Sequence, residues 1–367
     1  MNQPLFDLIG VGSPIMDVLA HVSDSFLTGN VPGDKGGMVL VDDADIATLV
    51  KKIGDQVAVT PGGSAANTTL GATRLGLKTT FLGKIGADQT AEAYYTNFTA
   101  TGGDGSRFKR ASLPNGRCLS LVTPDGQRTM RTHLGAAMTL HPDEVTLADF
   151  QHIRHAHIEG YLMFNPALAQ KVVATARAAG CTISLDLASF EVVVMARDWI
   201  LSQLKEGVHV LFANEDEIQA LFQNDTTYDN YARQLAAFGG IAAVKMGKDG
   251  AWLARGDELH RIEPVKVAKV VDTTGAGDAW AAGFLYGHLR GQSLAAAGSL
   301  GSGIPSMRCS TSTAAICTAG PYAVNARSCR ATYACGWIAA ASGRPNRRAP
   351  NARSIVTSAT GGSRSWS

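Results

Sequence analysis

Short hydrophobic runs alternate with longer segments of helical spacing through most of the chain. The runs lie at residues 8–12, 79–86, 155–163, 182–187, 209–214 and 242–247. Between them, segments such as 165–180 and 214–239 show spacing compatible with a helix and then end at glycine. Strands that alternate with helices in this way predict an α/β fold with a mostly parallel sheet and helices on both faces.

Two segments interrupt this alternation. Residues 17–41 contain short strand-like pieces, and residues 116–134 have the pattern of a hairpin around the turn PDGQ. Their apolar and polar positions alternate with a period of two, which is typical of an antiparallel sheet with one face open to water. We therefore predict a small antiparallel β lid beside the main sheet, formed by about residues 13–41 and 105–135.

The C-terminal part of the chain has a different composition. Residues 303–367 contain no Leu, Lys, Asp, Glu, Gln or Phe and are rich in Ala, Ser, Arg, Gly and Thr. Such a segment has few large apolar groups to offset the entropy of ordering. We predict one domain over residues 1–302, followed by an anomalous basic tail that reflects a shifted reading frame or, alternatively, a natural low-complexity extension. Sequencing the coding DNA would distinguish these origins.

The charge of the predicted domain argues against a nucleic-acid surface. The tail holds eight of the 33 Lys and Arg residues and no acidic residue, so residues 1–302 carry 25 basic and 31 acidic side chains, a net of −6. No run approaches the length of a membrane span. The six cysteines show no CxxC spacing, and the first residues lack the basic start of a signal peptide. These features favour a cytoplasmic protein with no nucleic-acid or membrane partner.

The stretch DTTGAGDAW at residues 272–280 carries the main candidate chemistry. An apolar pattern of helical spacing follows it from 279 to 289, so its glycines lie at a helix N-terminus, where free N–H groups and the helix dipole favour an anion. Asp278 falls in the first turn, and a carboxylate beside a bound phosphate is best explained as a base for an attacking hydroxyl. The structural alternative is an ordinary first-turn aspartate stabilised by the dipole.

Two further segments supply candidate ligands for a polyhydroxylated molecule. The helix predicted over residues 61–76 opens with Gly62 and Gly63, has Ser64 as its expected N-cap, and offers the donor and acceptor of Asn67. Asp17 follows the first strand at the mouth of the lid, where its carboxylate could accept bonds from two hydroxyls. The structural alternatives are a glycine-rich helix start and a surface-loop aspartate.

The NEDE stretch at residues 214–217 directly follows a predicted strand. Asn214 and Glu217 therefore face the carboxyl edge of the sheet, where a carboxylate could hold hydrated Mg²⁺ beside phosphates. An acidic first helical turn is the structural alternative. The histidines at 152, 155 and 157 lack a carboxylate or cysteine partner at matched spacing, so we assign them to packing rather than to a metal.

In this order, the motifs GGSAANT at 62–68, NEDE at 214–217, KMGKDG at 245–250 and DTTGAGDAW at 272–280 resemble those of the ribokinase (PfkB-type) family of sugar and nucleoside kinases. The resemblance covers about residues 5–300. It implies a three-layer α/β/α sandwich with a β lid, and the ATP- and Mg²⁺-dependent transfer of the γ-phosphate to a primary alcohol. The lid corresponds to the family's β flap, which closes over the acceptor and often serves as a homodimer surface.

The resemblance also implies roles for the matched residues. Asp278 would be the general base, and the backbone of Gly275, Ala276 and Gly277 would form the anion hole. The acceptor would contact Asp17, Gly62, Gly63, Asn67 and Glu159. Asn214 and Glu217 would organise phosphate and Mg²⁺, the latter through water, while Lys245, Gly247, Gly250 and Thr274 would lie near the nucleotide. Asp272 and Thr274 match positions that hold a monovalent cation such as K⁺.

Within the family, four stretches look most similar to the adenosine-kinase-like branch, namely GSPIMD and residues 36–42, 128–137 and 184–193. This likeness makes adenosine the lead acceptor among sugars and nucleosides. A catalytically inactive sugar or nucleotide sensor on the same fold is the alternative function. A dehydrogenase is a third interpretation, but the first strand runs into GVGSPIMD and lacks the GxGxxG helix start.

Overall fold

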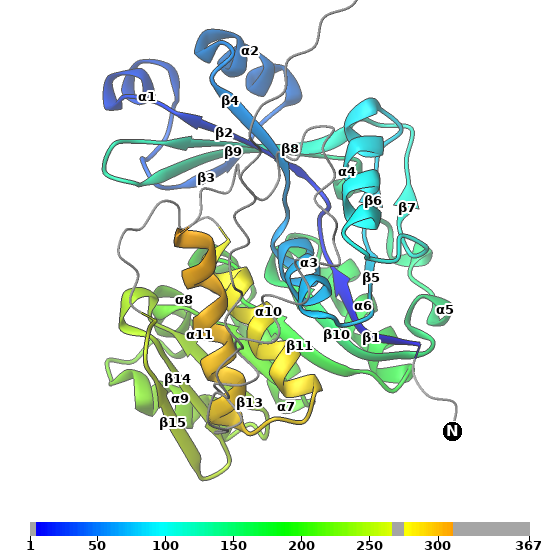
Figure 1. The fold of residues 1–367 in the computed structure, drawn as a ribbon, viewed down its shortest axis with the longest axis vertical. Coiled ribbons are helices and arrows are strands. Elements are labelled where there is room, and N and C mark those ends of the chain that lie inside the picture. The colour runs from blue at the N-terminus through cyan, green and yellow to red at the C-terminus, as the bar shows by residue number, and fades with distance from the viewer. Residues whose placement is uncertain (1–4, 266–274, 311–367) are drawn as a thin grey trace, which may run out of the picture. The chain divides into compact units, whose positions relative to one another are not determined.

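The computed structural model describes residues 5–265 and 275–310. An eight-stranded sheet lies at its centre, with the strand order β15-β14-β13-β12-β11-β10-β1-β5 (Figure 1). The strands from β5 to β13 in this order pair in parallel, and β14 and β15 add to them antiparallel. The strand bounds are Phe6–Val11 (β1), Thr79–Leu82 (β5), Ile153–Glu159 (β10), Thr182–Asp186 (β11), Val210–Ala213 (β12), Ile241–Lys245 (β13), Ala251–Arg255 (β14) and Glu258–Ile262 (β15). The predicted mostly parallel sheet is confirmed.

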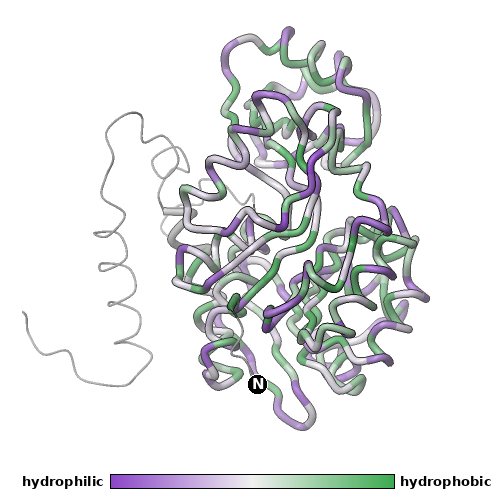
Figure 2. The backbone as a smooth tube through the Cα atoms, turned by 90° about the vertical axis from the view of Figure 1, so that its right-hand side faces the viewer, coloured by the Kyte–Doolittle hydropathy of each residue, from purple (hydrophilic) through white to green (hydrophobic). Residues whose placement is uncertain are grey.

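Helices cover both faces of this sheet, as predicted for a three-layer sandwich. Hydrophobic and hydrophilic stretches alternate along the chain (Figure 2). On one face lie α3 (Ser64–Leu75), α10 (Ala276–Leu289) and α11 (Leu294–Ser310). On the other lie α6 (Pro166–Ala178), α7 (Phe190–Lys205), α8 (Glu215–Phe222) and α9 (Tyr228–Ala236). The remaining helices of the main domain are α4 (Gln89–Ala100), α5 (Leu147–Phe150) and the 3₁₀ helices η1 (Ala136–Thr139), η2 (Pro142–Glu144), η3 (Gly160–Phe164) and η4 (Gly247–Asp249).

Aromatic packing fixes α10 on the sheet. The Phe212 ring of β12 meets the Trp280 and Phe284 rings edge to face, with centroids 6.2 and 5.6 Å apart. Gly71 lets α3 approach closely, because a Cβ at this position would lie only 2.7 Å from the Ala282 side chain of α10. The first turns of α3 and α10 are therefore held side by side.

A five-stranded sheet in the order β3-β9-β8-β2-β4 forms the lid (Figure 1). Its strands are β2 (Met16–His21), β3 (Met38–Leu40), β4 (Val57–Pro61), β8 (Asn115–Val122) and β9 (Arg128–Gly135), and its helices are α1 (Asp24–Asn30) and α2 (Asp43–Ile53). The predicted hairpin is present as the antiparallel pair β8–β9. The sheet is mixed rather than purely antiparallel, because β2–β8 and β3–β9 pair in parallel. It also includes β4, which lies outside the residues predicted for the lid.

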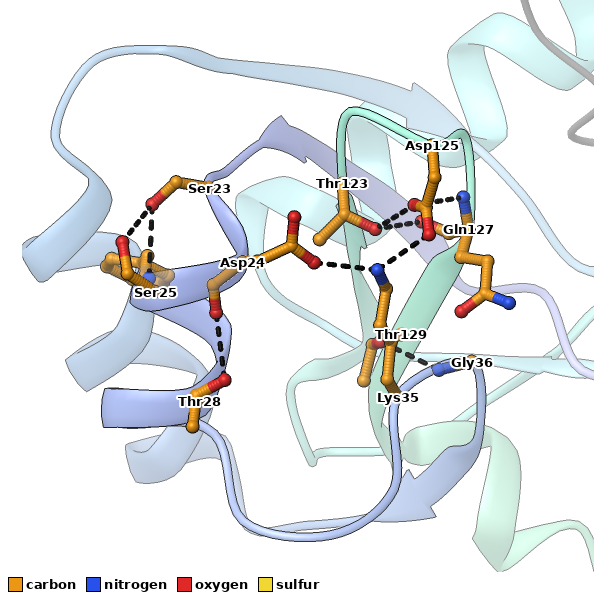
Figure 3. Close-up of polar contacts among 11 residues, drawn as sticks. Ser23, Asp24, Ser25, Thr28, Lys35, Gly36, Thr123, Asp125, Gln127 and Thr129 are labelled. Atoms are coloured by element: carbon orange, nitrogen blue, oxygen red, sulfur yellow. Dashed lines mark hydrogen bonds and ion pairs between the residues drawn. The ribbon is translucent and has the colours of Figure 1, made fainter.

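A small two-stranded sheet lies outside both larger sheets and pairs β6 (Lys84–Ile85) with β7 (Lys109–Arg110). In the loop between α1 and β3 of the lid, the Lys35 ammonium bridges two carboxylates. It lies 2.7 Å from an oxygen of Asp24 in α1 and 2.7 Å from one of Asp125 in the β8–β9 turn (Figure 3). The cluster ties the first lid helix to the hairpin.

The predicted boundary at residue 302 falls within α11 (Leu294–Ser310). The tail from residue 311 onward lies outside the described residues, so its origin stays a prediction. Over 5–265 and 275–310, no helix is both long enough and apolar enough to cross a bilayer.

Candidate active site

The first turn of α10 presents backbone N–H groups at the carboxyl edge of the sheet. Gly275 is the N-cap and adopts the left-handed conformation (φ 66°, ψ 17°), which glycine reaches without steric cost. Ala276 and Gly277 open the helix, and first-turn N–H groups have no intrahelical partner. The predicted position of Gly275 and Gly277 at a helix N-terminus is therefore confirmed. The cation positions Asp272 and Thr274 lie outside the described residues, so that prediction stays untested.

Side chains of α3 hold the Asp278 carboxylate. Ser64 Oγ donates to Oδ1 at 2.9 Å, and Asn67 Nδ2 donates to Oδ2 at 3.0 Å. Thr68 Oγ1 bonds the main-chain oxygen of Asp278 at 3.2 Å. The expected N-cap role of Ser64 is wrong: Gly63 is the N-cap and Ser64 is the first helical residue, so its hydroxyl is directed to Asp278 instead.

The environment of Asp278 suits a base. Burial raises the pKa of its carboxyl group, and the nearby Asp186 carboxylate raises it further. The hydrogen bonds from Asn67 and Ser64 and the charge of Lys245 oppose this rise. Such a balance strengthens the basicity of the carboxylate while the donors still favour its ionised form.

Lys245 lies beside this helix start. Its side chain is only 14% exposed, and its Nζ donates to Asp186 Oδ2 at 3.0 Å. A Cβ at Gly277 would lie 3.3 Å from this Nζ, so the ammonium is next to the α10 backbone. Lys245 was predicted from the sequence, whereas Asp186 was not, although a carboxylate that ends a buried parallel strand was the available signal.

Asn214 and Glu217 bond to each other across the first turn of α8. The Asn214 main-chain N–H and Nδ2 donate to the two oxygens of Glu217, each at 2.8 Å, and Glu217 N–H donates to Asn214 Oδ1 at 2.9 Å. Burial raises the pKa of Glu217 to about 7. The structure thus brings the pair together as a capping box in an acidic first helical turn, the latter being the structural alternative named for this motif.

Two other predicted nucleotide residues lie in the turn that follows β13. Gly247 and Gly250 have positive φ angles of 45° and 86°; Gly247 opens η4 and Gly250 is its C-cap. A Cβ at Gly250 would lie 2.1 Å from the Ile262 main-chain oxygen, so only glycine fits this turn. Within the described part of the chain, no group of three or more His, Cys, Asp and Glu side chains could hold a metal ion.

The predicted acceptor residues meet where the lid joins α3. A Cβ at Gly62 would lie 2.3 Å from the carboxylate carbon of Asp17, so the Asp17 side chain lies against bare backbone. Gly63 has a φ of 95°, and a Cβ there would lie 2.2 Å from the Ser13 main-chain oxygen. Asn67 of α3 reaches Asp278 of α10, so the predicted base lies beside the acceptor candidates at the start of α3.

Glu159 is buried between the central sheet and the lid connections. It is 1% exposed, and its oxygens accept from the main-chain N–H groups of Ser13 at 2.7 Å and Ala65 at 3.0 Å. Gly12 leaves room for it, because a Cβ there would lie 2.2 Å from a Glu159 oxygen. In this structure the carboxylate therefore joins the β1–β2 connection to the start of α3.

The strand histidines make internal hydrogen bonds. His155 bonds the hydroxyls of Thr182 and Ser184 at 2.7 and 2.8 Å, and His157 bonds Ser184 at 2.8 Å. Both are fully buried, and burial lowers the pKa of each ring. These contacts support the packing role predicted for them.

Comparisons with known proteins agree on one kinase family. The family model described as pfkB family carbohydrate kinase matches residues 38–319. An uncharacterized sugar kinase of Archaeoglobus fulgidus is 30% identical over 63% of this chain and 91% of its own length. The adenosine kinase of Sinorhizobium meliloti superposes with a TM-score of 0.77 at 30% identity, over 89% of this chain and 98% of that one. A probable sugar kinase of Rhizobium etli also gives 0.77, at 31% identity over 91% and 100% of the two chains.

Proposed function

Because the chain belongs to the pfkB family of carbohydrate kinases, we propose that it transfers the γ-phosphate of ATP to a hydroxymethyl group of a sugar or nucleoside. Adenosine is the lead acceptor, supported by the similarity to the Sinorhizobium meliloti adenosine kinase. Other sugars stay in the acceptor class because relatives of similar identity are named as sugar kinases.

In the proposed reaction, Asp278 removes the proton from the acceptor hydroxyl. The hydroxyl oxygen forms a bond to the γ-phosphorus, the bond from phosphorus to the β–γ bridging oxygen breaks, and ADP leaves. The N–H groups at Gly275, Ala276 and Gly277 would stabilise the charge on the phosphoryl oxygens, together with the positive end of the α10 dipole.

The observation that carries this proposal is the position of Asp278. Its carboxylate lies in the first turn of a glycine-capped helix and is oriented by two donors from α3, Ser64 and Asn67. A pure binding protein would need neither an oriented base nor a raised pKa beside an anion site. Lys245, next to Gly277, adds the positive charge expected beside a polyphosphate.

The residues near Glu217 fit a Mg²⁺ ion whose other ligands are phosphate oxygens and water molecules. Such an ion needs only one or two protein carboxylates, and Glu217 supplies a buried one at the carboxyl edge of the sheet. When bound, Mg²⁺ would neutralise charge on the β- and γ-phosphates. Asn214 would orient Glu217 through the bonds described above.

The lid would complete the acceptor site. Asp17 on β2 pairs in register with Cys118 on β8, and Cys118 pairs with Thr132 on β9. Cys118 and Thr132 therefore lie in the same row of the lid sheet as Asp17, the carboxylate proposed to bind the acceptor. Closure over the acceptor would exclude water, which otherwise competes for the phosphoryl group. We also propose that the lid forms a homodimer surface.

An ATP-consumption screen tests the proposal. Release of ADP is measured with adenosine, other nucleosides, ribose, fructose and ketodeoxygluconate, for the wild type and for Asp278→Asn. We expect turnover with at least one acceptor, strongest with adenosine, and a loss of about 10²- to 10⁴-fold in the variant. Calorimetric titration should show that the variant still binds the same acceptor.

Two outcomes would contradict the proposal. Acceptor-dependent ADP release in Asp278→Asn equal to that of the wild type would remove Asp278 as the base. Acceptor binding by the wild type without turnover, across the whole panel, would instead favour a binding protein. A strong response to another sugar but not to adenosine would change only the acceptor.

A further inference from the structure

We propose that Asp186 is a positioning residue, which holds the Lys245 ammonium against the start of α10 so that Lys245 contacts the polyphosphate of the nucleotide. The proposal rests on the proposed function, since it takes a nucleoside triphosphate as the ligand. It adds to that function Asp186, a residue of the stretch 184–193 to which the sequence assigned no site role, and a reason for the placement of the lysine.

Asp186 is fixed by bonds from two directions. It ends β11, its side chain is 5% exposed, and its Oδ1 accepts from the Ala188 main-chain N–H at 3.1 Å. Ala188 has a left-handed φ of 67°, and the bond from its N–H to the carboxylate helps to hold this tight turn after the strand. The other oxygen, Oδ2, is thereby aimed at Lys245.

Lys245 comes from the next strand but one and is confined on its other sides. Its Nζ lies 5.8 Å from the centre of the Phe212 ring and would lie 3.3 Å from a Cβ at Gly277. An ammonium has three donors, and the bond to Asp186 uses one of them. The remaining donors lie beside the helix start at which the phosphate is proposed to bind.

The charges around Lys245 explain why a buried ammonium is tolerated. Burial acts to lower the pKa of Lys245, but the carboxylates of Asp186, Glu217 and Asp278 outweigh it, so the pKa is raised and the charge is kept. One cation thus lies among three carboxylates. Without it, a polyphosphate at this helix start would meet these carboxylates without the positive charge that Lys245 supplies.

Equilibrium binding of a non-hydrolysable ATP analogue tests this pair of residues, the Asp186–Lys245 clamp, without requiring turnover. We expect Lys245→Met to weaken binding by about 10- to 100-fold, as for the loss of a hydrogen bond from a charged group. Asp186→Asn should weaken it less. In the Lys245→Met background, Asp186→Asn should cause no further loss, because Asp186 acts through the lysine.

Matched surface substitutions provide the controls. Lys171→Met on α6 and Asp198→Asn on α7 change exposed side chains and should leave binding unchanged. Asp186→Asn leaves a buried ammonium without its partner, so folding is checked by a thermal melt. Should this variant not fold, Asp186→Glu, which keeps the charge but displaces the oxygens, takes its place.

The pH profile of kcat/KM separates this role from a merely structural one. Asp186 raises the pKa of Asp278 and Lys245 lowers it. The acidic limb of the profile should therefore move to lower pH in Asp186→Asn and to higher pH in Lys245→Met. A general loosening of the site would not move the limb in opposite directions.

The outcomes keep this proposal distinct from the proposed function. If the wild type phosphorylates an acceptor but Lys245→Met binds the analogue normally, or if Asp186→Asn weakens binding equally with and without Lys245, the clamp is wrong and the kinase activity stands. If the predicted binding pattern appears in a wild type that phosphorylates no acceptor, the clamp stands and the kinase function is wrong.

Discussion

Asn67 Nδ2 and Asp278 Oδ2 lie 3.0 Å apart, so the first turn of α3 directly orients a carboxylate in the first turn of α10. The two residues are 211 positions apart in the chain. Their bond links the proposed acceptor side of the site to the proposed phosphate side. The close approach of the helices at Gly71 makes this contact available.

The two side-chain donors to Asp278 should tune its basicity. Both bonds lower the pKa of Asp278 against the effect of burial, so Asn67→Leu or Ser64→Ala should raise this pKa. Because the base acts when ionised, the acidic limb of kcat/KM should then move to higher pH. Thr68→Val is the matched control, since Thr68 bonds the main chain of Asp278 rather than its carboxylate. If the acidic limb of kcat/KM does not move in either donor variant, these bonds do not set the pKa of Asp278.

Gly62 should control the position of Asp17. A Cβ at Gly62 would overlap the Asp17 carboxylate, so Gly62→Ala should displace it and raise the KM for the acceptor by roughly tenfold, equivalent to about 1.4 kcal/mol. The KM for ATP should change little. Initial rates with each substrate varied in turn provide the measurement. Gly29→Ala in α1 is the control, because open space surrounds that position.

An equal rise in both KM values for Gly62→Ala would point to a general distortion of the site. That result would remove the specific link between Gly62 and the acceptor. An unchanged acceptor KM would show that Asp17 does not contact the acceptor.

The central sheet and the site glycines could be predicted from the sequence because local signals specify them. Buried parallel strands are short apolar runs, and the glycines of 272–280 directly precede an apolar helix. The antiparallel strands β14 and β15 were missed, although Gly256 and Asp257 between alternating residues were a hairpin signal. The parallel pairings within the lid depend on long-range register, which no local pattern specifies.

The candidate site could be predicted where the role of a residue follows from its local sequence. It was harder to predict where the role depends on a partner far away in the chain. Ser64 has the local pattern of an N-cap, but Asp278 competes for its hydroxyl and determines its role. Asp186 gains its significance from Lys245, 59 positions away, and no spacing rule connects the two. Glu159 was assigned by resemblance to the acceptor, whereas its oxygens bond Ser13 and Ala65 here.

Glu159 should make the stability of the protein depend on pH. Burial raises its pKa from 4.5 to about 7, so between these values the folded protein holds a proton that the unfolded chain releases. The stabilisation from this proton is present below about pH 4.5 and is lost as the pH rises through about 7. Glu159→Gln cannot titrate, so the stability of the wild type relative to the variant should fall across this window.

Urea denaturation at several pH values measures this difference in the free energy of unfolding. The altered hydrogen bonds to Ser13 and Ala65 shift the free energy of unfolding of the variant at every pH. The prediction is therefore tested by how the difference between wild type and variant changes with pH. Glu263→Gln, at a side chain that is 80% exposed, is the control and should show no such slope. A flat difference between wild type and Glu159→Gln would mean that Glu159 keeps the same protonation state in both forms.

The lid edge should determine whether the protein dimerises. Val59 is 55% exposed on β4, an edge strand of the lid sheet, and an apolar side chain beside unpaired backbone groups favours pairing with a second copy. We expect the wild type to sediment as a dimer at micromolar concentration and Val59→Lys to sediment as a monomer, because the interface would have to bury the ammonium. Met138→Lys, at a 65% exposed position in η1 outside the lid sheet, should leave the dimer intact. A monomeric wild type would contradict the predicted dimer itself. A dimer that persists in Val59→Lys would place the contact elsewhere than on this edge.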